Sequence, residues 1–100
     1  MKKEEITALF EDFEQAACEV NQVECWSARD LCQLLGYSLW QNFAKVIDKA
    51  KVACSNVGQY VDDHFIDVNK MVSIGSGAER QIDDIMLTRY ACYLVAQDAR

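Results

Sequence analysis

The sequence predicts an α+β fold, with a helix-turn-helix-like helical core and a small antiparallel β-hairpin. Apolar residues recur at helical spacing near both ends and in the middle of the chain. Residues 65–74 are rich in strand formers and precede the turn-forming triplet 75–77, Gly-Ser-Gly. Between residues 27 and 54, two serine-led capping signals flank a glycine, which is the spacing of two helices joined by a short turn.

Two short-linked helices are predicted on either side of Gly36. Ser27 and Ser38 each precede, by three residues, a side chain that can return to the backbone amide of the cap. Gly36 can adopt the positive φ that ends a helix, so the first helix covers 28–35. The second covers 39–54 and is the clearest helical pattern, because its apolar residues keep helical spacing throughout.

An amphipathic helix and a short strand are predicted before this pair. Apolar residues recur at three- and four-residue intervals from Ile6 to Val20, which predicts a helix over about 3–18. The composition of 23–26 favours a short strand, in which Trp26 anchors the core.

A hairpin and a last helix are predicted after Gly58, which ends the long helix. The hairpin pairs 65–74 with 79–83 and forms a wing beside the helices. Helical periodicity resumes near Ile85, so we expect the last helix there, capped by Asp83-Asp84.

Length and composition favour one domain over residues 1–100, with a single core. The apolar runs are too short to cross a bilayer and the start lacks the apolar centre of a secretion signal, so we expect a cytoplasmic protein without membrane contact. The five cysteines are an odd number without a C-x-x-C pair, which favours reduced thiols. The sequence stops without a glycine or a polar tail, so we expect the N-terminal part of a longer protein.

The charge balance opposes simple attraction to nucleic acid. With 16 acidic and 10 basic residues, the net charge is −6, so the whole chain repels a polyanion at long range. Contact with DNA therefore needs a local basic stripe, and the alternative is a protein partner.

One such stripe is predicted on the outer side of the long helix. Its candidate residues are Gln41, Asn42, Lys45 and Lys49, with Lys51 and Arg29 as further candidates. Amide side chains early in a second helix, followed by lysines one and two turns later, are of the types that contact base edges and phosphates. An ordinary solvated helix surface is the alternative interpretation.

The sequence offers little catalytic machinery. His64 is the only histidine and has Asp62, Asp63 and Asp67 nearby, but a metal site needs three or four converging ligands and a catalytic base needs a nucleophile. We interpret His64 as a residue that caps or packs at the start of the hairpin. The triplet 75–77 lacks the Lys-Ser/Thr of a P-loop. We therefore expect no catalytic residues, no cofactor, no metal and no enzymatic activity.

Four stretches of the sequence resemble the family of bacterial DNA-damage-inducible D proteins. They are Met1-Lys2-Lys3-Glu4-Glu5-Ile6; Trp26-Ser27-Ala28-Arg29-Asp30-Leu31 with Leu34-Leu35-Gly36-Tyr37; Trp40-Gln41-Asn42-Phe43 through Lys49-Ala50-Lys51; and Leu87-Thr88-Arg89-Tyr90-Ala91-Cys92-Tyr93-Leu94. The same core is similar to the Bro-N domain of baculovirus repeated proteins and phage antirepressors.

The resemblance implies a regulatory role in the SOS response, where this family is associated with inhibiting and dismantling RecA filaments on single-stranded DNA. The expected partner is then a RecA filament or DNA itself. The alternative is a DNA-binding module of antirepressor type acting in transcription regulation, in which the stripe enters a groove and residues 75–77 touch the backbone. A homodimer formed through the first or last helix is a third possibility. The family is usually longer, so its activity can require further residues.

Overall fold

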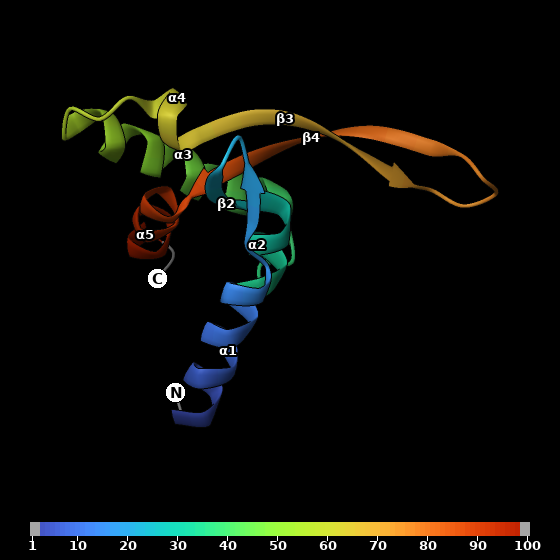
Figure 1. Cartoon of the computed structure of the whole chain (residues 1–100), viewed down its shortest axis with the longest axis horizontal. Helices are drawn as coiled ribbons and strands as arrows, with labels where there is room; N and C mark the ends of the chain where they lie inside the picture. The colour runs from blue at the N-terminus through green and yellow to red at the C-terminus, as the bar shows by residue number, and fades with distance from the viewer. Residues whose placement is uncertain (1–2, 99–100) are drawn as a thin grey trace.

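The computed structural model describes residues 3–98, which form five helices and one four-stranded antiparallel sheet (Figure 1). In chain order the elements are α1 Lys3–Gln15, β1 Cys18–Val20, β2 Val23–Ser27, α2 Ala28–Leu34, α3 Trp40–Asn56, α4 Val61–His64, β3 Phe65–Ser73, β4 Glu79–Thr88 and α5 Arg89–Asp98. The predicted α+β class is confirmed. Within residues 3–98, no helix has the length and apolarity that a bilayer crossing requires.

The sheet has the strand order β1-β2-β4-β3, so the central pair joins residues far apart in the sequence. Trp26 of β2 lies opposite Leu87 of β4, which in turn lies opposite Phe65 of β3. Directly opposite residues share one face of an antiparallel sheet. This row is 0–3% exposed and forms the centre of the core.

Helices α2, α3 and α5 contribute the rest of that core. On α3 the buried residues are Phe43, Ile47, Ala50 and Cys54, which confirms the predicted helical spacing. Helix α1 joins through an aromatic stack of Phe13 on Trp26, with ring centroids 4.4 Å apart. The indole nitrogen of Trp26 also donates to the Phe13 carbonyl at 2.6 Å, which confirms Trp26 as a core anchor. The Ile6 side chain, expected in the same stripe, lies outside the described part.

The cysteines are free thiols, as predicted. Cys18 is exposed and the other four are buried. Burial raises the pKa of the Cys92 thiol to about 12. These buried thiols therefore act as small apolar core residues.

The predicted turn between α2 and α3 is confirmed in part. Gly36 has a φ of 82°, and the amide of Asp30 donates to the Ser27 hydroxyl at 3.3 Å, so the first cap exists. The second predicted cap is wrong, because α3 has Leu39 at its N-cap without a side-chain bond. Ser38 lies one residue too early in the chain.

The first helix ends at Gln15, before the predicted end near residue 18, and residues 18–20 form a strand that was not predicted. Asn21 and Gln22 have positive φ values of 52° and 68°, which an α-helix cannot accommodate. They form the two-residue turn that folds β1 back on β2, with Val20 opposite Val23.

The last helix begins at Arg89, later than the predicted Ile85, because β4 continues to Thr88. Asp84 was expected to cap this helix, and that prediction is wrong. It is 2% exposed and instead caps α2 across the sheet, since it accepts from the Ser27 hydroxyl at 2.5 Å and from the Arg29 amide at 3.1 Å. Thr88 caps α5 through the Ala91 amide at 3.2 Å.

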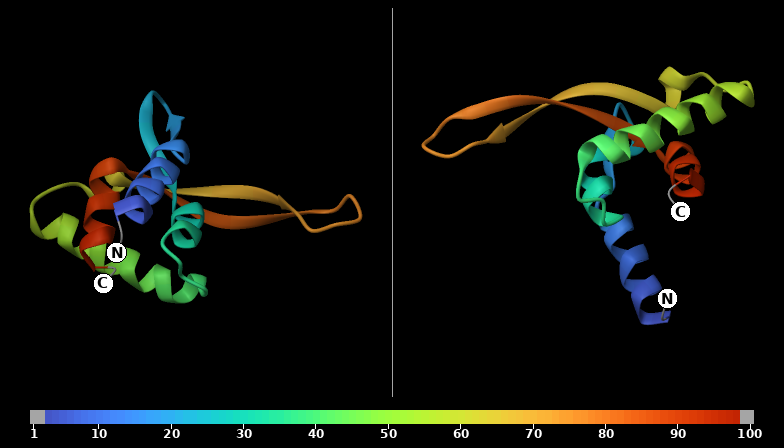
Figure 2. Two further views of the ribbon diagram at one scale, coloured as in Figure 1. Left: turned by 90° about the horizontal axis from the view of Figure 1, so that it is seen from below. Right: turned by 180° about the vertical axis from the view of Figure 1, so that it is seen from behind.

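The predicted hairpin is present, with strands of nine and ten residues. Strand β2 pairs only with residues 86–88 of β4, at the end of the hairpin that lies next to the helices. The outer part of the hairpin therefore projects away from the other elements (Figures 1 and 2). We call residues 69–83 the arm and the remaining elements the body. Figure 2 shows that α1 and the arm project in different directions.

Candidate nucleic-acid interface

Four of the predicted contact residues lie together on the exposed side of α3. Gln41, Asn42, Lys45 and Lys49 are all exposed, and the opposite side of the helix carries the buried core residues. We call these four residues the α3 polar face. Their grouping follows from the 100° rotation per residue of an α-helix.

The α3 polar face is locally basic on an acidic chain. Neither Lys45 nor Lys49 forms an ion pair with any of the side chains that the structure describes. Asp48 lies between them on the helix and is also exposed. The two ammonium groups therefore face solvent, where they can contact an anionic group without breaking an existing pair.

Lys51 lies on a different side of α3. Its position around the helix matches that of Trp40 and Ala44, which face the hairpin, and it is half-buried. The structure therefore separates Lys51 from the α3 polar face.

Arg29 is held by contacts within the body. Its guanidinium lies over the Trp40 ring, 4.3 Å from the centroid, and its Nε donates to the Asp83 carbonyl at 2.6 Å. It thereby connects α2, α3 and β4. These contacts give Arg29 a packing role, whereas its predicted contact with nucleic acid stays a prediction.

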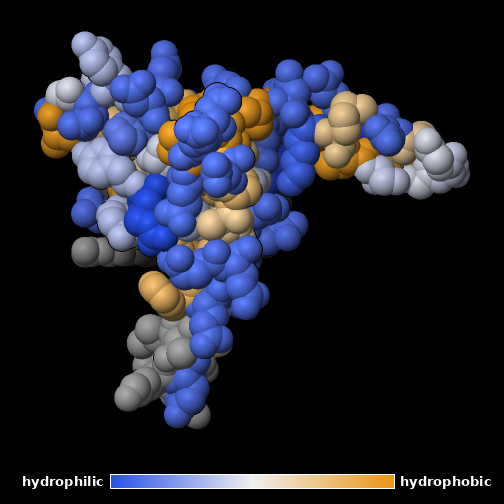
Figure 3. All heavy atoms as spheres, in the orientation of Figure 1, coloured by the Kyte–Doolittle hydropathy of each residue, from blue (hydrophilic) through white to orange (hydrophobic). Residues whose placement is uncertain are grey.

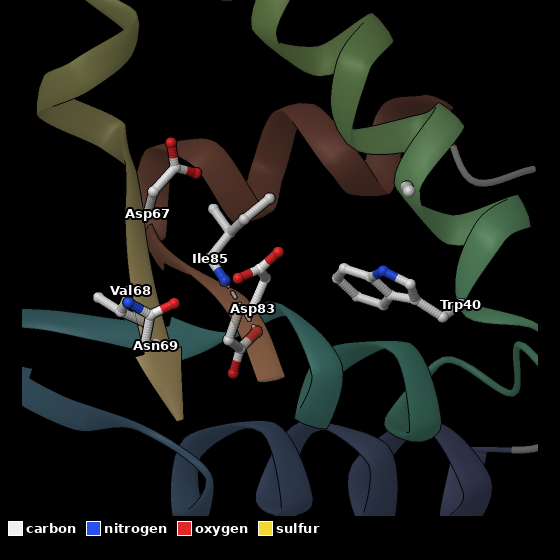
Figure 4. A pocket seen from close by; sticks show the side chains of 8 residues that line it. Trp40, Asp67, Val68, Asn69, Asp83 and Ile85 are labelled. Atoms are coloured by element: carbon white, nitrogen blue, oxygen red, sulfur yellow. Dashed lines mark hydrogen bonds between the residues drawn. The ribbon is translucent and has the colours of Figure 1, made fainter. Parts of the chain in front are cut away.

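A pocket of about 500 Å³ with several carboxylates lies between the start of α3 and the base of the hairpin (Figure 4). Trp40 forms one wall, and Asp67, Asn69 and Asp83 approach it from the two strands. The carboxylates make this pocket unfavourable for a phosphate. Contact with a nucleic acid is therefore expected on the outer side of α3 and not in this pocket.

His64 packs at the start of the hairpin, as predicted. Its Nδ1 is 2.8 Å from the Thr88 hydroxyl, and its ring lies against Tyr90 with centroids 4.8 Å apart. Within residues 3–98, no three of the His, Cys, Asp and Glu side chains converge as ligands for a metal ion. These contacts therefore explain His64 as a residue that packs between the start of the hairpin and α5.

Two basic residues of the arm, Lys70 and Arg80, are absent from the sequence-based candidates. Lys70 forms an ion pair with Asp30 of α2 at 3.6 Å, and Arg80 is exposed. They share a face of the arm only because of the strand register, which no signal in the sequence fixes.

Comparison with known proteins agrees with the resemblance seen in the sequence. Residues 16–100 match the BRO family, N-terminal domain, and the chain belongs to that family. It is also similar to the DNA damage-inducible protein D of Escherichia coli (strain K12), with 54% identity over 78 residues. That alignment covers 78% of this chain and 28% of the relative, so the chain spans little more than a quarter of the relative's length. No solved structure matches the chain significantly.

Proposed function

We propose that this chain is a non-enzymatic regulatory domain of a DNA-damage response protein and that it contacts nucleic acid through the α3 polar face. The observation that carries the proposal is the placement of two amides and two unpaired lysines on one exposed helix side. The family and the similarity to a damage-inducible protein support the regulatory setting.

The dimensions and residue order of α3 suit a helix that lies in the major groove. Its 17 residues give a length of about 25 Å, and the major groove admits a helix of this kind. Gln41 and Asn42 lie in the first turn, where recognition helices contact base edges. Lys45 and Lys49 follow one and two turns later, in position for the phosphates.

A RecA filament on single-stranded DNA is the second candidate target. The net charge of −6 favours it, because an acidic domain repels bare DNA at long range and a protein-coated filament presents less phosphate. The similarity to a damage-inducible protein supports the same target. On this alternative, the α3 polar face contacts the filament and the regulatory effect is exerted on its assembly.

Fluorescence anisotropy of labelled duplex and single-stranded oligonucleotides, at about 50 and 200 mM salt, tests the proposal. We expect binding that weakens steeply with salt. Lys45→Ala and Lys49→Ala should each reduce the slope of log K against log salt by about one. Lys51→Ala is the matched control, since it removes a lysine from the other side of the same helix.

Equal binding by the parent and the Lys45→Ala/Lys49→Ala variant would reject the α3 polar face. The absence of binding to either oligonucleotide at the lower salt would reject direct DNA contact. A titration of RecA filaments with the same variants would then test the second candidate.

A further inference from the structure

Strand β3 lies at an edge of the sheet along its whole length. In the strand order β1-β2-β4-β3, its one neighbour among residues 3–98 is β4, and the outer part of the hairpin projects beyond the other elements (Figures 1 and 2). An edge strand has a row of backbone N–H and C=O groups that no strand of its own sheet pairs. The nine-residue edge of β3 is therefore a template for a further strand.

Strand β3 lacks the features that commonly protect an edge from pairing. Its register with β4 runs from Phe65 to Ser73 without a bulge, and its sequence has no proline. Its single lysine, Lys70, is half-buried and forms an ion pair with Asp30 of α2 at 3.6 Å. This ion pair directs the ammonium group toward the body, so it does not guard the edge.

The outer edge of β4 is less suited to pairing. Strand β2 covers residues 86–88 of β4, and the Arg29 side chain of α2 donates to the carbonyl of Asp83 at 2.6 Å. The outer residues of β4 include Glu79 and Arg80, whose charged side chains disfavour pairing at an edge. The open edge of the hairpin is therefore that of β3.

The open backbone groups belong to Met71 and to the residues that alternate with it. At the outer end of the hairpin, the amide of Ile74 donates to the Ala78 carbonyl at 3.1 Å, so it points to the side of β4. Backbone groups of successive residues point to opposite edges of a strand. The amides of Asn69, Met71 and Ser73 therefore point to the open edge.

The same strand end carries exposed apolar side chains. Met71 and Ile74 are 57% and 60% exposed, and Figure 3 shows apolar side chains on the projecting part of the molecule. A two-stranded hairpin is marginally stable in water by itself. Exposed apolar groups beside open backbone groups favour an interaction in which another strand covers both.

The arm is neutral, although the chain is acidic. Residues 69–83 contain two basic residues, Lys70 and Arg80, and two acidic residues, Glu79 and Asp83, whereas the whole chain has a net charge of −6. Two copies that approach through their bodies therefore repel each other, but their arms can meet without net repulsion. Among the surfaces described, the arm is the one best suited to contact a second copy.

The sequence of β3 and of the residue after it is complementary to itself in one register. An antiparallel pair with its twofold axis at Met71 places this residue opposite its own counterpart and Ile74 opposite Val68 of the second copy. Lys70 then lies opposite Val72, so no like charges face each other directly. This register covers both of the exposed apolar side chains.

The neighbouring registers are less favourable. An axis at Lys70 would place two lysines directly opposite each other, which is destabilising. An axis at Asn69 would leave Ile74 beyond the paired strand, and an axis nearer the turn would shorten the paired stretch. The register centred on Met71 is therefore the one that backbone, apolar and charged groups favour together.

We propose that two copies of the chain pair through the open edges of β3, antiparallel and with the twofold axis at Met71. The outward amides and carbonyls of the two strands then form about six backbone hydrogen bonds, because each opposite pair of this kind exchanges two. The two sheets become continuous, and the two bodies lie at opposite ends of the paired arms. The same edge is used twice, so the dimer is closed.

The proposed dimer does not depend on nucleic-acid binding. The α3 polar face contributes no residue to β3, and the test of the dimer contains no nucleic acid. Failure of either proposal therefore leaves the other to be judged by its own experiment.

Sedimentation equilibrium of the chain from about 1 μM to about 1 mM tests the proposal. We expect a monomer–dimer equilibrium. Met71→Pro removes the outward amide at the centre of the interface and keeps the bonds between β3 and β4, so it should weaken the dimer at least about tenfold. Gln81→Pro is the matched control, because it removes the outward amide of the residue opposite Met71 on β4. It should leave the dimer unchanged.

Cysteine cross-linking tests the register separately. In a Cys18→Ser background, which removes the exposed native thiol, Met71→Cys places two thiols directly opposite each other across the twofold axis. Mild oxidation should then give a covalent dimer on a non-reducing gel. Gln81→Cys, on the same face of the hairpin but one strand away from the interface, should not cross-link.

Three results would overturn the proposal, provided that circular dichroism shows folded variants. The first is a parent that remains monomeric over the whole concentration range, which would leave a strand of another protein as the occupant of the edge. The second is a dimer that Gln81→Pro weakens as much as Met71→Pro does. The third is equal cross-linking of the Met71→Cys and Gln81→Cys variants.

Discussion

The body and the arm contain parts of the same two strands and differ in what surrounds them. At their inner ends, Phe65 and Leu87 are 3% and 0% exposed and contact side chains from several helices. Beyond Asn69 and Asp83, the strands contact mainly each other, and Met71 is more than half exposed. The difference teaches that strand pairing gives the hairpin its shape, whereas burial gives the body its stability.

Asp84 is the boundary between the two regions. Its carboxylate is buried against the first turn of α2, where it is fully bonded, while the neighbouring Asp83 is exposed. One step along the strand therefore separates a carboxylate fixed in the body from one in contact with solvent.

The largest expected difference is between Phe43 in the body and Met71 in the arm. Phe43→Ala should lower the free energy of unfolding by about 3–5 kcal/mol, because it leaves a cavity in a fully buried site. Met71→Ala should change it by less than about 0.5 kcal/mol. Urea denaturation measures both, and similar losses for the two variants would contradict the distinction.

A smaller difference is expected between the adjacent aspartates. Asp84→Ala should cost about 2–3 kcal/mol, since it leaves the Ser27 hydroxyl and the Arg29 amide without their buried acceptor. Asp83→Ala should be nearly neutral, because that side chain is exposed. Thermal or urea unfolding of both variants is the measurement, and a harmless Asp84→Ala would refute the proposed boundary.

The smallest difference concerns two glycines with similar backbones, Gly36 at φ 82° in the body and Gly77 at φ 74° in the arm. Both have open space where a Cβ would lie, so alanine acts through backbone strain alone. Gly36→Ala should lower the global unfolding free energy by about 1 kcal/mol. Gly77→Ala should leave it unchanged and only speed amide hydrogen exchange in the arm. Equal global effects would show that the arm unfolds together with the body.

The sequence predicted those elements whose signals are local. The long helix follows from its apolar spacing, the turn after α2 from Gly36, and the hairpin from the glycines at 75 and 77. The continuation of β4 to Thr88 could not be read in this way, because the apolar spacing near Leu87 suits both a helix and a strand. Pairing with Trp26, distant in the sequence, decides in favour of the strand.

In the candidate interface, too, features set by one helix were predicted, whereas features set by contacts between elements were not. The α3 polar face was predicted because a single helix sets it, and the same rotation per residue could have separated Lys51 from it. The position of Arg29 could not be predicted, because it depends on contacts with Trp40 and Asp83 from other elements. Which side chains share a face of the arm depends on the strand register, which the sequence alone did not fix.

The bond between Ser27 and Asp84 also has a consequence for folding on the ribosome. The first turn of α2 gains its buried acceptor, and Trp26 its neighbour Leu87, only when residues 84–88 have been synthesised. Contacts of such long sequence separation carry a loop-closure cost and slow folding. The nascent chain therefore emerges with Trp26 lacking its neighbour Leu87, and the sheet of the body closes late, over a segment that chaperones can reach until then.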